Sequence, residues 1–111
     1  MNFETTIGKQ NISILHIDGK ILGTASDTFR KEMSEQLQTG HDKLVVNLMN
    51  VPLIDSSALG AIVVTLKSCQ QSGGKLVLLS PQKAVREVLE VTKLNTVIEI
   101  YDTEEGACNA F

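Results

Sequence analysis

The sequence has few of the residues from which several classes of functional site are built. Its 111 residues include two cysteines, three phenylalanines, one tyrosine and no tryptophan. Cys69 and Cys108 stand far apart and outside any CxxC pair. This spacing argues against a disulfide framework or a structural metal site and favours a reducing compartment. Four dispersed aromatic side chains also provide no platform on which nucleic-acid bases could stack.

Charge and hydropathy argue against two further classes of partner. The net charge is −3, and no run of Lys and Arg is longer than two residues, so nucleic acid would meet no basic patch. The longest apolar stretch, 58–66, is far shorter than the roughly 20 residues of a membrane-spanning helix. The first ten residues lack the apolar core of a signal peptide. We therefore expect a cytoplasmic protein that binds neither nucleic acid nor a membrane.

Short runs of Val, Ile and Leu alternate with amphipathic segments along the chain. Strands are expected within 3–7, 11–18, 43–48, 75–80 and 96–101. Helices are expected within 24–40, 56–74, 80–92 and 102–111. Near-continuous apolar runs are typical of buried parallel strands, and their alternation with helices indicates a parallel sheet with helical cover. The sequence predicts a single α/β domain over 1–111, with a mainly parallel sheet of four to five strands and about four helices.

Polar residues and prolines indicate where three of these helices begin. Thr24 and Asp27 resemble a capping box for the first helix. For the third, Ser80 would be the N-cap and Pro81 the first helical residue. Asp102 would cap the last helix.

The stretch PLIDSSALG, residues 52–60, places a carboxylate and two hydroxyls at the start of the second helix. In sheets of this kind, functional residues gather where a strand has ended and a helix begins. One cap, worth about 1 kcal/mol, needs only one of the three polar side chains. The stretch is compatible with simple capping or with a hydroxyl that accepts a phosphate, and spacing leaves both open.

The predicted outer face of the same helix contains Ser56, Gly60 and Val64, if Leu59 and Ile62 point inward. Glycine costs a helix about 1 kcal/mol relative to alanine. Gly60 removes bulk one turn beyond Ser56, so either a partner or a neighbouring strand of the same fold could approach closely. The spacing does not separate these two explanations.

Enzymatic readings of the stretch lack their companion residues. A nucleophilic Ser56 would need a histidine base and an oxyanion hole, but the stretch is not GxSxG and no motif ties either histidine to it. A receiver-type phosphoacceptor at Asp55 would need an acidic pair, whereas Asp18 stands alone, and Lys75 begins a strand instead of ending one. Neither GxxxxGK[ST] nor GxGxxG occurs, so no nucleotide, metal or other cofactor is expected.

Taken together, three segments resemble the STAS domain of the anti-sigma factor antagonist family. They are VVNLMNVPLIDSSALGAIV (45–63), GGKLVLLSP (73–81) and VREVLEVTKLNTVIEIYDTEEGA (85–107). DSSALG, 55–60, is similar to the family pattern D-S-[ST]-[GA]-[LV]-G. The resemblance covers almost the whole chain and implies a STAS-like fold. It also implies a protein that is not an enzyme but binds an anti-sigma factor, often a serine kinase, and so frees a sigma factor.

The same resemblance implies which residues form the site. The kinase would phosphorylate the serine directly after the aspartate, here Ser56, and a serine phosphatase would restore the binding form. Asp55 would cap the helix, and Ser57 would hold the loop by hydrogen bonds. The predicted partner surface consists of Gly19, Lys20, Ile21, Leu22, Gly23, Thr24, Asp55, Ser57, Gly60 and Val64.

A phosphoryl group on Ser56 would change the charge of this surface. Phosphoserine carries about −1.5 to −2 charges, and a helix N-terminus tolerates an anion. Beside Asp55 the surface would become strongly negative. A partner packed against Ser56 and Gly60 would meet steric bulk and, if it is acidic, repulsion, with little change in the fold. Leu22 departs from the family, which often has an aspartate there. The alternative role is a STAS binding module that is never phosphorylated, such as a transport-system subunit or a scaffold, in which Ser56 is only a cap.

Overall fold

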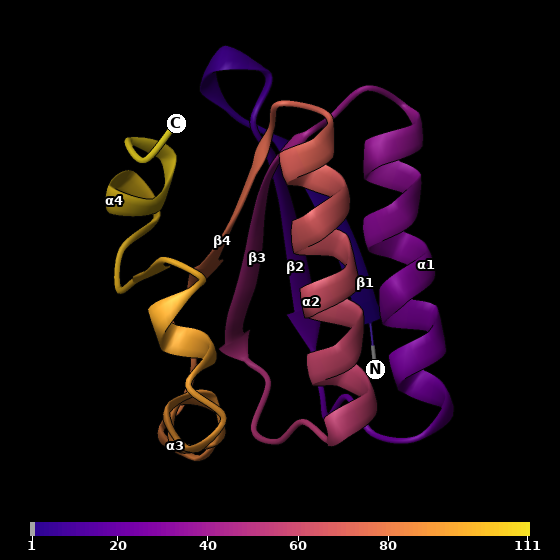
Figure 1. The fold of residues 1–111 in the computed structure, drawn as a ribbon, viewed down its shortest axis with the longest axis vertical. Coiled ribbons are helices and arrows are strands. Elements are labelled where there is room, and N and C mark those ends of the chain that lie inside the picture. The colour runs from indigo at the N-terminus through magenta and orange to yellow at the C-terminus, as the bar shows by residue number, and fades with distance from the viewer. Residues whose placement is uncertain (1) are drawn as a thin grey trace.

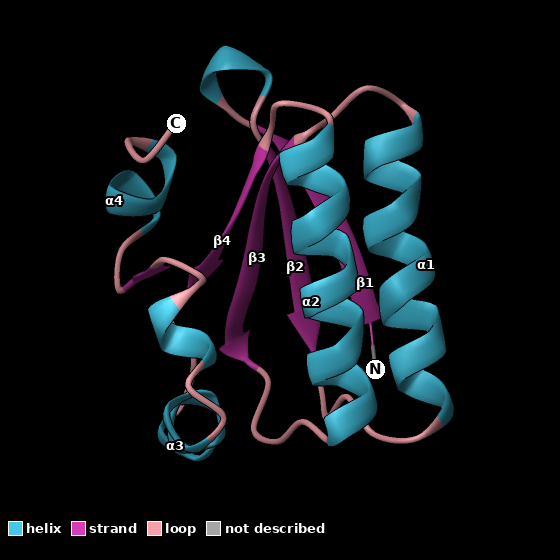
Figure 2. Cartoon of the chain, viewed as in Figure 1, coloured by secondary structure: helices cyan, strands magenta, loops and turns pink. Residues whose placement is uncertain are grey.

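The chain forms a sheet covered by helices (Figures 1 and 2), described for residues 2–111 in a computed structural model. The sheet has five strands. The strands are β1 Asn2–Ile7, β2 Ser13–Asp18, β3 Lys43–Asn50, β4 Lys75–Leu79 and β5 Ile100–Tyr101. The helices are α1 Thr24–Gln38, α2 Ser56–Gln71, α3 Lys83–Val91 and α4 Glu104–Cys108, with 3-10 turns at Lys9–Asn11 and Leu94–Thr96. The order in the sheet is β1-β2-β3-β4-β5, with only the β1–β2 pair antiparallel. The predicted α/β fold with a mainly parallel sheet is confirmed.

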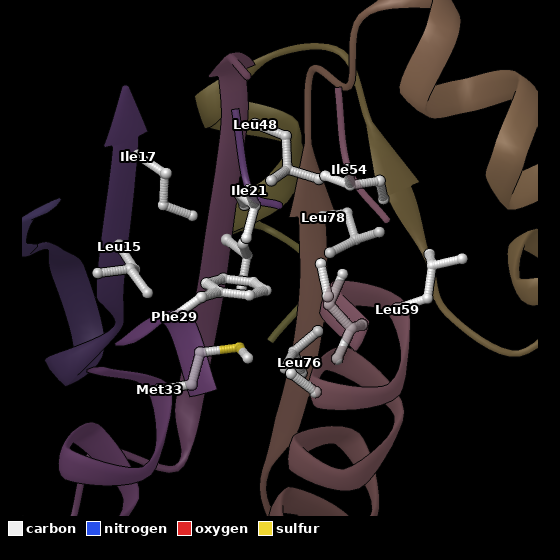
Figure 3. Close-up of a cluster of buried hydrophobic side chains, with 14 of the residues drawn as sticks. Leu15, Ile17, Ile21, Phe29, Met33, Leu48, Ile54, Leu59, Leu76 and Leu78 are labelled. Carbon is white, nitrogen blue, oxygen red and sulfur yellow. The ribbon is translucent and has the colours of Figure 1, made fainter. Parts of the chain in front are cut away.

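Alternating side chains of the central strands divide the core into two layers. In β2, Leu15 and Ile17 join the larger cluster, and Ile14 joins the smaller one on the other face. The larger cluster packs the sheet against α1, α2 and α3, and Figure 3 shows Phe29 of α1 within it. The smaller cluster includes Ala107 of α4, which packs against the other face of the sheet.

The helix starts differ from the sequence prediction at three places. The N-cap of α1 is Gly23, with no capping side chain on that residue, so the Thr24 capping box is wrong. The N-cap of α3 is Gln82, so the prediction that Ser80 caps it is also wrong. In α4 the cap is Thr103 instead of Asp102, and its side chain accepts from the Gly106 N–H at 3.1 Å.

Ser80 is displaced from the helix by contacts with β5. Its φ is +50°, its N–H donates to the Tyr101 carbonyl at 2.7 Å, and its hydroxyl donates to the Asp102 carbonyl at 2.8 Å. β5 itself is only two residues long: of the predicted strand 96–101, Thr96 ends the 3-10 turn Leu94–Thr96 and residues 97–99 form no strand. The C-terminal half of the chain therefore departs most from a regular β–α alternation.

The starts of α1 and α2 lie at the same end of the sheet, where the parallel strands β2 and β3 end (Figure 1). Ile21 and Ile54 form an isolated parallel bridge between the two loops that lead into these helices. Within residues 2–111, no helix is both long and apolar enough to cross a bilayer. This end of the sheet contains the predicted site.

Candidate functional site

Backbone hydrogen bonds join the two loops at this end of the sheet. The Gly19 N–H donates to the Asn50 carbonyl at 3.0 Å, and the Ile21 N–H donates to the Leu53 carbonyl at 3.0 Å. The Asp55 N–H in turn donates to the Ile21 carbonyl at 3.2 Å. The β2–α1 loop is thus fixed directly beside the residue that precedes α2.

The Asp55 carboxylate accepts three hydrogen bonds from its own chain. Its Oδ1 accepts from the Ala58 N–H at 3.0 Å, which makes Asp55 the N-cap of α2. Oδ1 also accepts from the Ser26 hydroxyl at 2.9 Å, and Oδ2 accepts from the Gly23 N–H at 2.7 Å. The hydrogen bond from Gly23 and then that from Ala58 hold the pKa of Asp55 below its ordinary value of 3.8, because both favour the charged form. The expectation that Asp55 caps the helix is confirmed.

These bonds predict a pH-dependent effect of Asp55→Asn on stability. Since the folded-state pKa lies below the unfolded one, the ionised carboxylate stabilises the fold above the ordinary pKa of 3.8. That contribution is lost as the pH falls through the folded-state pKa. The amide side chain cannot accept from both Gly23 and Ala58 as the carboxylate does. We expect the variant to be less stable than the wild type at neutral pH and the difference to shrink in acid.

Urea unfolding of both proteins from neutral pH to about pH 3 measures this difference. Asp27→Asn is the matched control, since Asp27 is an exposed carboxylate of the neighbouring helix. Its Oδ1 lies 3.8 Å from a guanidinium nitrogen of Arg30. A constant difference in the free energy of unfolding between wild type and Asp55→Asn at every pH would contradict the assignment.

Ser56 and Ser57 are exposed, and both belong to the first turn of α2. Within the described part of the chain, neither hydroxyl makes a hydrogen bond. The capping position belongs to Asp55, so the reading in which Ser56 is the cap is wrong. The hydrogen bonds expected from the Ser57 hydroxyl to the loop are likewise not formed. Of the three polar residues, one is used by the fold and two present free hydroxyls.

Gly60 faces an open groove between α1 and α2. A Cβ atom built on Gly60 would meet no atom within 4 Å, so no close contact inside the fold requires a glycine there. The groove is lined by Ser26, Asp27 and Arg30 of α1 and by Ser57, Gly60, Ala61 and Val64 of α2. Of the two explanations for Gly60, a close approach by a strand of the same fold is excluded. An approaching partner remains compatible with the structure.

The segment 19–24 contributes unequally to this surface. Lys20, Leu22, Gly23 and Thr24 are exposed, whereas Gly19 is half-buried. Ile21 is fully buried in the larger core cluster, so its predicted contact with a partner is wrong for the side chain. Leu22 and Leu53, on the two loops, are 38% and 40% exposed.

Sequence reasoning missed Ser26 and Leu53. Ser26 lies one turn before Phe29 on the buried face of α1 and is 3% exposed, but nothing in its spacing indicated a bond to Asp55. A polar residue on an otherwise apolar helix face was the only available signal. Leu53 belongs to the quoted stretch 52–60, and its exposure follows from the bridge that turns Ile54 inward.

The two histidines form their hydrogen bonds with residues outside the candidate site. The His16 ring contacts Thr6 Oγ1 at 3.0 Å and Asn47 Nδ2 at 3.0 Å, and His41 contacts Thr39 Oγ1 at 3.0 Å. Neither ring hydrogen-bonds Ser56. Over residues 2–111, no group of three or more His, Cys, Asp or Glu side chains is placed to hold a metal ion.

Comparison with known proteins identifies the fold and the family together. The STAS domain family matches residues 5–107, and the chain belongs to this family. It is 45% identical over 69 residues to a Thermotoga maritima protein named "Putative anti-sigma factor antagonist", covering 62% of this chain and 61% of that protein. It is 29% identical over 99 residues to the anti-sigma F factor antagonist of Paenibacillus polymyxa, covering 88% and 85% of the two chains.

A solved structure agrees over nearly the full length. The crystal structure of a putative anti-sigma factor antagonist from Thermotoga maritima superposes with a TM-score of 0.91 at 34% identity, covering 97% of this chain and 92% of that one. The sequence alignment with the curated Thermotoga maritima relative, by contrast, spans 61% of that relative's length. The resemblance to a STAS domain, stated from the segments 45–63, 73–81 and 85–107, is confirmed.

Proposed function

We propose that this chain is an anti-sigma factor antagonist that is switched by phosphorylation of Ser56. In the unphosphorylated form it binds an anti-sigma factor of the serine kinase type and so frees the sigma factor. The observation that carries the proposal is the division of roles between two adjacent residues. Asp55 caps α2 and is engaged by its own fold, while the Ser56 hydroxyl is exposed and unengaged. The names of the Thermotoga and Paenibacillus relatives support the class.

The phosphorylation step needs nothing from this chain except the hydroxyl. The kinase transfers the γ-phosphoryl group of ATP to Ser56 Oγ, so that an O–P bond forms, the bond to ADP breaks, and the hydroxyl proton passes to a base of the kinase. A serine phosphatase hydrolyses the phosphoester with water and releases inorganic phosphate. No cofactor or metal of the chain itself takes part, and we propose no enzymatic activity for it.

The switch acts through charge and bulk at the surface. The phosphoryl group adds about −1.5 to −2 charges beside the ionised Asp55. The N-terminus of α2 tolerates this anion within the domain. Because the Ser56 hydroxyl makes no bond in the fold, its modification breaks no internal hydrogen bond. A partner seated over Gly60, Val64 and the exposed part of 19–24 would meet the added bulk and, where its own face is acidic, electrostatic repulsion, while the fold stays unchanged.

Paired baits test the proposal in an extract of the source cells. Ser56→Ala removes the acceptor hydroxyl, and Ser56→Asp places a permanent negative charge at the same point. Ser34→Asp is the charge control, since it adds the same charge at an exposed position of α1 that does not line the groove, and it should recover as much anti-sigma factor as Ser56→Ala. Bound proteins are identified by mass spectrometry, and circular dichroism verifies that each bait is folded.

We expect Ser56→Ala to recover an anti-sigma factor with a kinase-type ATPase domain and Ser56→Asp to recover at least about tenfold less. A tenfold loss corresponds to about 1.4 kcal/mol, and like charges opposed across an interface cost several kcal/mol where the partner's face is acidic. Equal recovery by both baits would contradict the switch and favour the constitutive binding module. A transporter component in place of an anti-sigma factor would contradict the proposed partner while leaving the family assignment intact.

A further inference from the structure

One carboxylate joins the starts of two helices that are distant in the sequence. The N-cap residue of α1 is Gly23, which has no side chain with which to cap, and its N–H donates to Asp55 Oδ2 at 2.7 Å. The same carboxylate caps α2 through the Ala58 N–H at 3.0 Å. Asp55 therefore accepts backbone hydrogen bonds at the starts of both helices, although in the sequence it directly precedes only α2.

Ser26 holds this carboxylate from the side of the core. It is 3% exposed, and its hydroxyl donates to Asp55 Oδ1 at 2.9 Å. A buried hydroxyl is costly without a partner, and Asp55 is the partner in this structure. Phe29, one turn further along α1, is fully buried against the sheet, so α1 provides Ser26 with a rigid support.

We infer that Ser26 is a positioning residue for the partner surface, because its bond to Asp55 fixes the segment 19–24 relative to Ser56. This inference rests on the proposed function, since positioning matters only if a partner binds there. We call Gly23, Ser26 and Asp55 the latch. Asp55 and Ser26 then support the surface from behind.

The surrounding bonds explain why the latch would act on this segment. The backbone of Ile21 is bonded to Leu53 and Asp55, so the middle of the loop is held independently of the latch. The residues after Ile21, including the exposed Leu22, are held at their far end by the Gly23 bond to Asp55. Gly23 has φ +57°. A glycine released from its hydrogen bond can adopt many other backbone conformations. Loss of the Ser26 hydroxyl should therefore loosen the stretch around Leu22 first.

Ser26→Ala removes one hydroxyl and leaves a good helix former in its place. Ser34→Ala is the matched control, as Ser34 is exposed on the same helix. Two measurements use the isolated chain: hydrogen exchange of the Gly23 amide, and NMR titration of the Asp55 carboxyl group. The third is recovery, from extract of the source cells, of the anti-sigma factor that the wild type captures. The amide NMR spectrum shows whether each variant is folded.

We expect the Gly23 amide of Ser26→Ala to exchange about tenfold faster than that of the wild type, the factor that follows from losing one hydrogen bond to a charged group. The Asp55 titration should move to higher pH, since a donor that favoured the charged form is gone. Recovery of the anti-sigma factor should fall about tenfold, and Ser34→Ala should match the wild type in all three.

Each contrary result overturns a distinct step. Unchanged exchange and titration in Ser26→Ala would show that the latch does not hold the segment. Changed exchange and titration with full recovery of the anti-sigma factor would show that the latch does not position the partner surface. If the wild type captures no anti-sigma factor although both isolated-chain measurements respond, the proposed function fails and the positioning role fails with it, while the internal bonds stand.

Discussion

Replacing Phe29 by alanine is expected to lower the free energy of unfolding by about 3–5 kcal/mol. Phe29 is fully buried in the larger core cluster (Figure 3) and stacks on Phe3 of β1, with ring centroids 6.5 Å apart. Truncation removes this contact and leaves a cavity between α1 and the sheet, which the surrounding structure fills only in part. Urea unfolding at neutral pH measures the loss.

Val91→Ala is the control for this measurement. Val91 lies at the end of α3 and is 83% exposed, so its truncation should change the free energy of unfolding by less than about 0.5 kcal/mol. If Phe29→Ala cost no more than Val91→Ala, the packing of α1 described above would be wrong. The anchoring of Ser26 one turn away would then lose its basis.

Gly74→Ala is expected to destabilise the fold by about 3 kcal/mol, the upper part of the range for overpacking. A Cβ at Gly74 would lie 2.1 Å from the Asp42 carbonyl oxygen and 2.6 Å from the Asp42 Cβ. That oxygen accepts from the Lys75 N–H at 2.9 Å, where β4 begins beside β3. The backbone cannot withdraw from the new methyl group without disturbing the start of this strand pair.

Gly60→Ala is the matched glycine control, because it adds the same methyl group where no atom lies within 4 Å. Alanine is the better helix former, so the fold should gain up to about 1 kcal/mol. Thermal or urea unfolding of both variants against the wild type separates the two positions. Equal stability of Gly74→Ala and Gly60→Ala would show that the close approach to Asp42 is not rigid.

Periodicity was sufficient to predict the central part of the fold. β2, β3 and β4 are buried on both faces, so each appears in the sequence as a near-continuous apolar run. α1 and α2 have clear C-terminal signals, since Gly40 and Gly73 take positive φ directly after them. Such features depend on local chemistry and on burial, and both can be recognised without knowledge of tertiary contacts.

Helix starts depended on tertiary contacts and were predicted less well. Gly23 lies at the N-cap of α1 because Asp55, from another loop, takes its N–H. Ser80 is drawn away from α3 by bonds to Tyr101 and Asp102 of the neighbouring strand region. The sequence around a helix start does not show hydrogen-bond partners that are distant along the chain. Capping rules based on local sequence therefore predicted the wrong N-cap residues for these helices.

The candidate site shows the same limit. Spacing alone left capping and phosphorylation both open for residues 55–57, and only the family resemblance assigned the cap to Asp55. The structure assigns capping to Asp55 and leaves the Ser56 hydroxyl free. It also removes Ile21 from the predicted surface, because its bridge to Ile54 turns the side chain into the core. Ser26 could not be found from spacing, since its role exists only through Asp55.

The most direct test of the proposed switch is to map the phosphate on the protein itself. Wild type, Ser56→Ala and Ser57→Ala are incubated with γ-labelled ATP in an extract of the source cells, and incorporated label and modified peptides are measured. We predict label in the wild type and in Ser57→Ala, with the phosphate on Ser56, and its loss in Ser56→Ala. Label that persists in Ser56→Ala, or maps to Ser57 in the wild type, would contradict the assignment of the switch to Ser56.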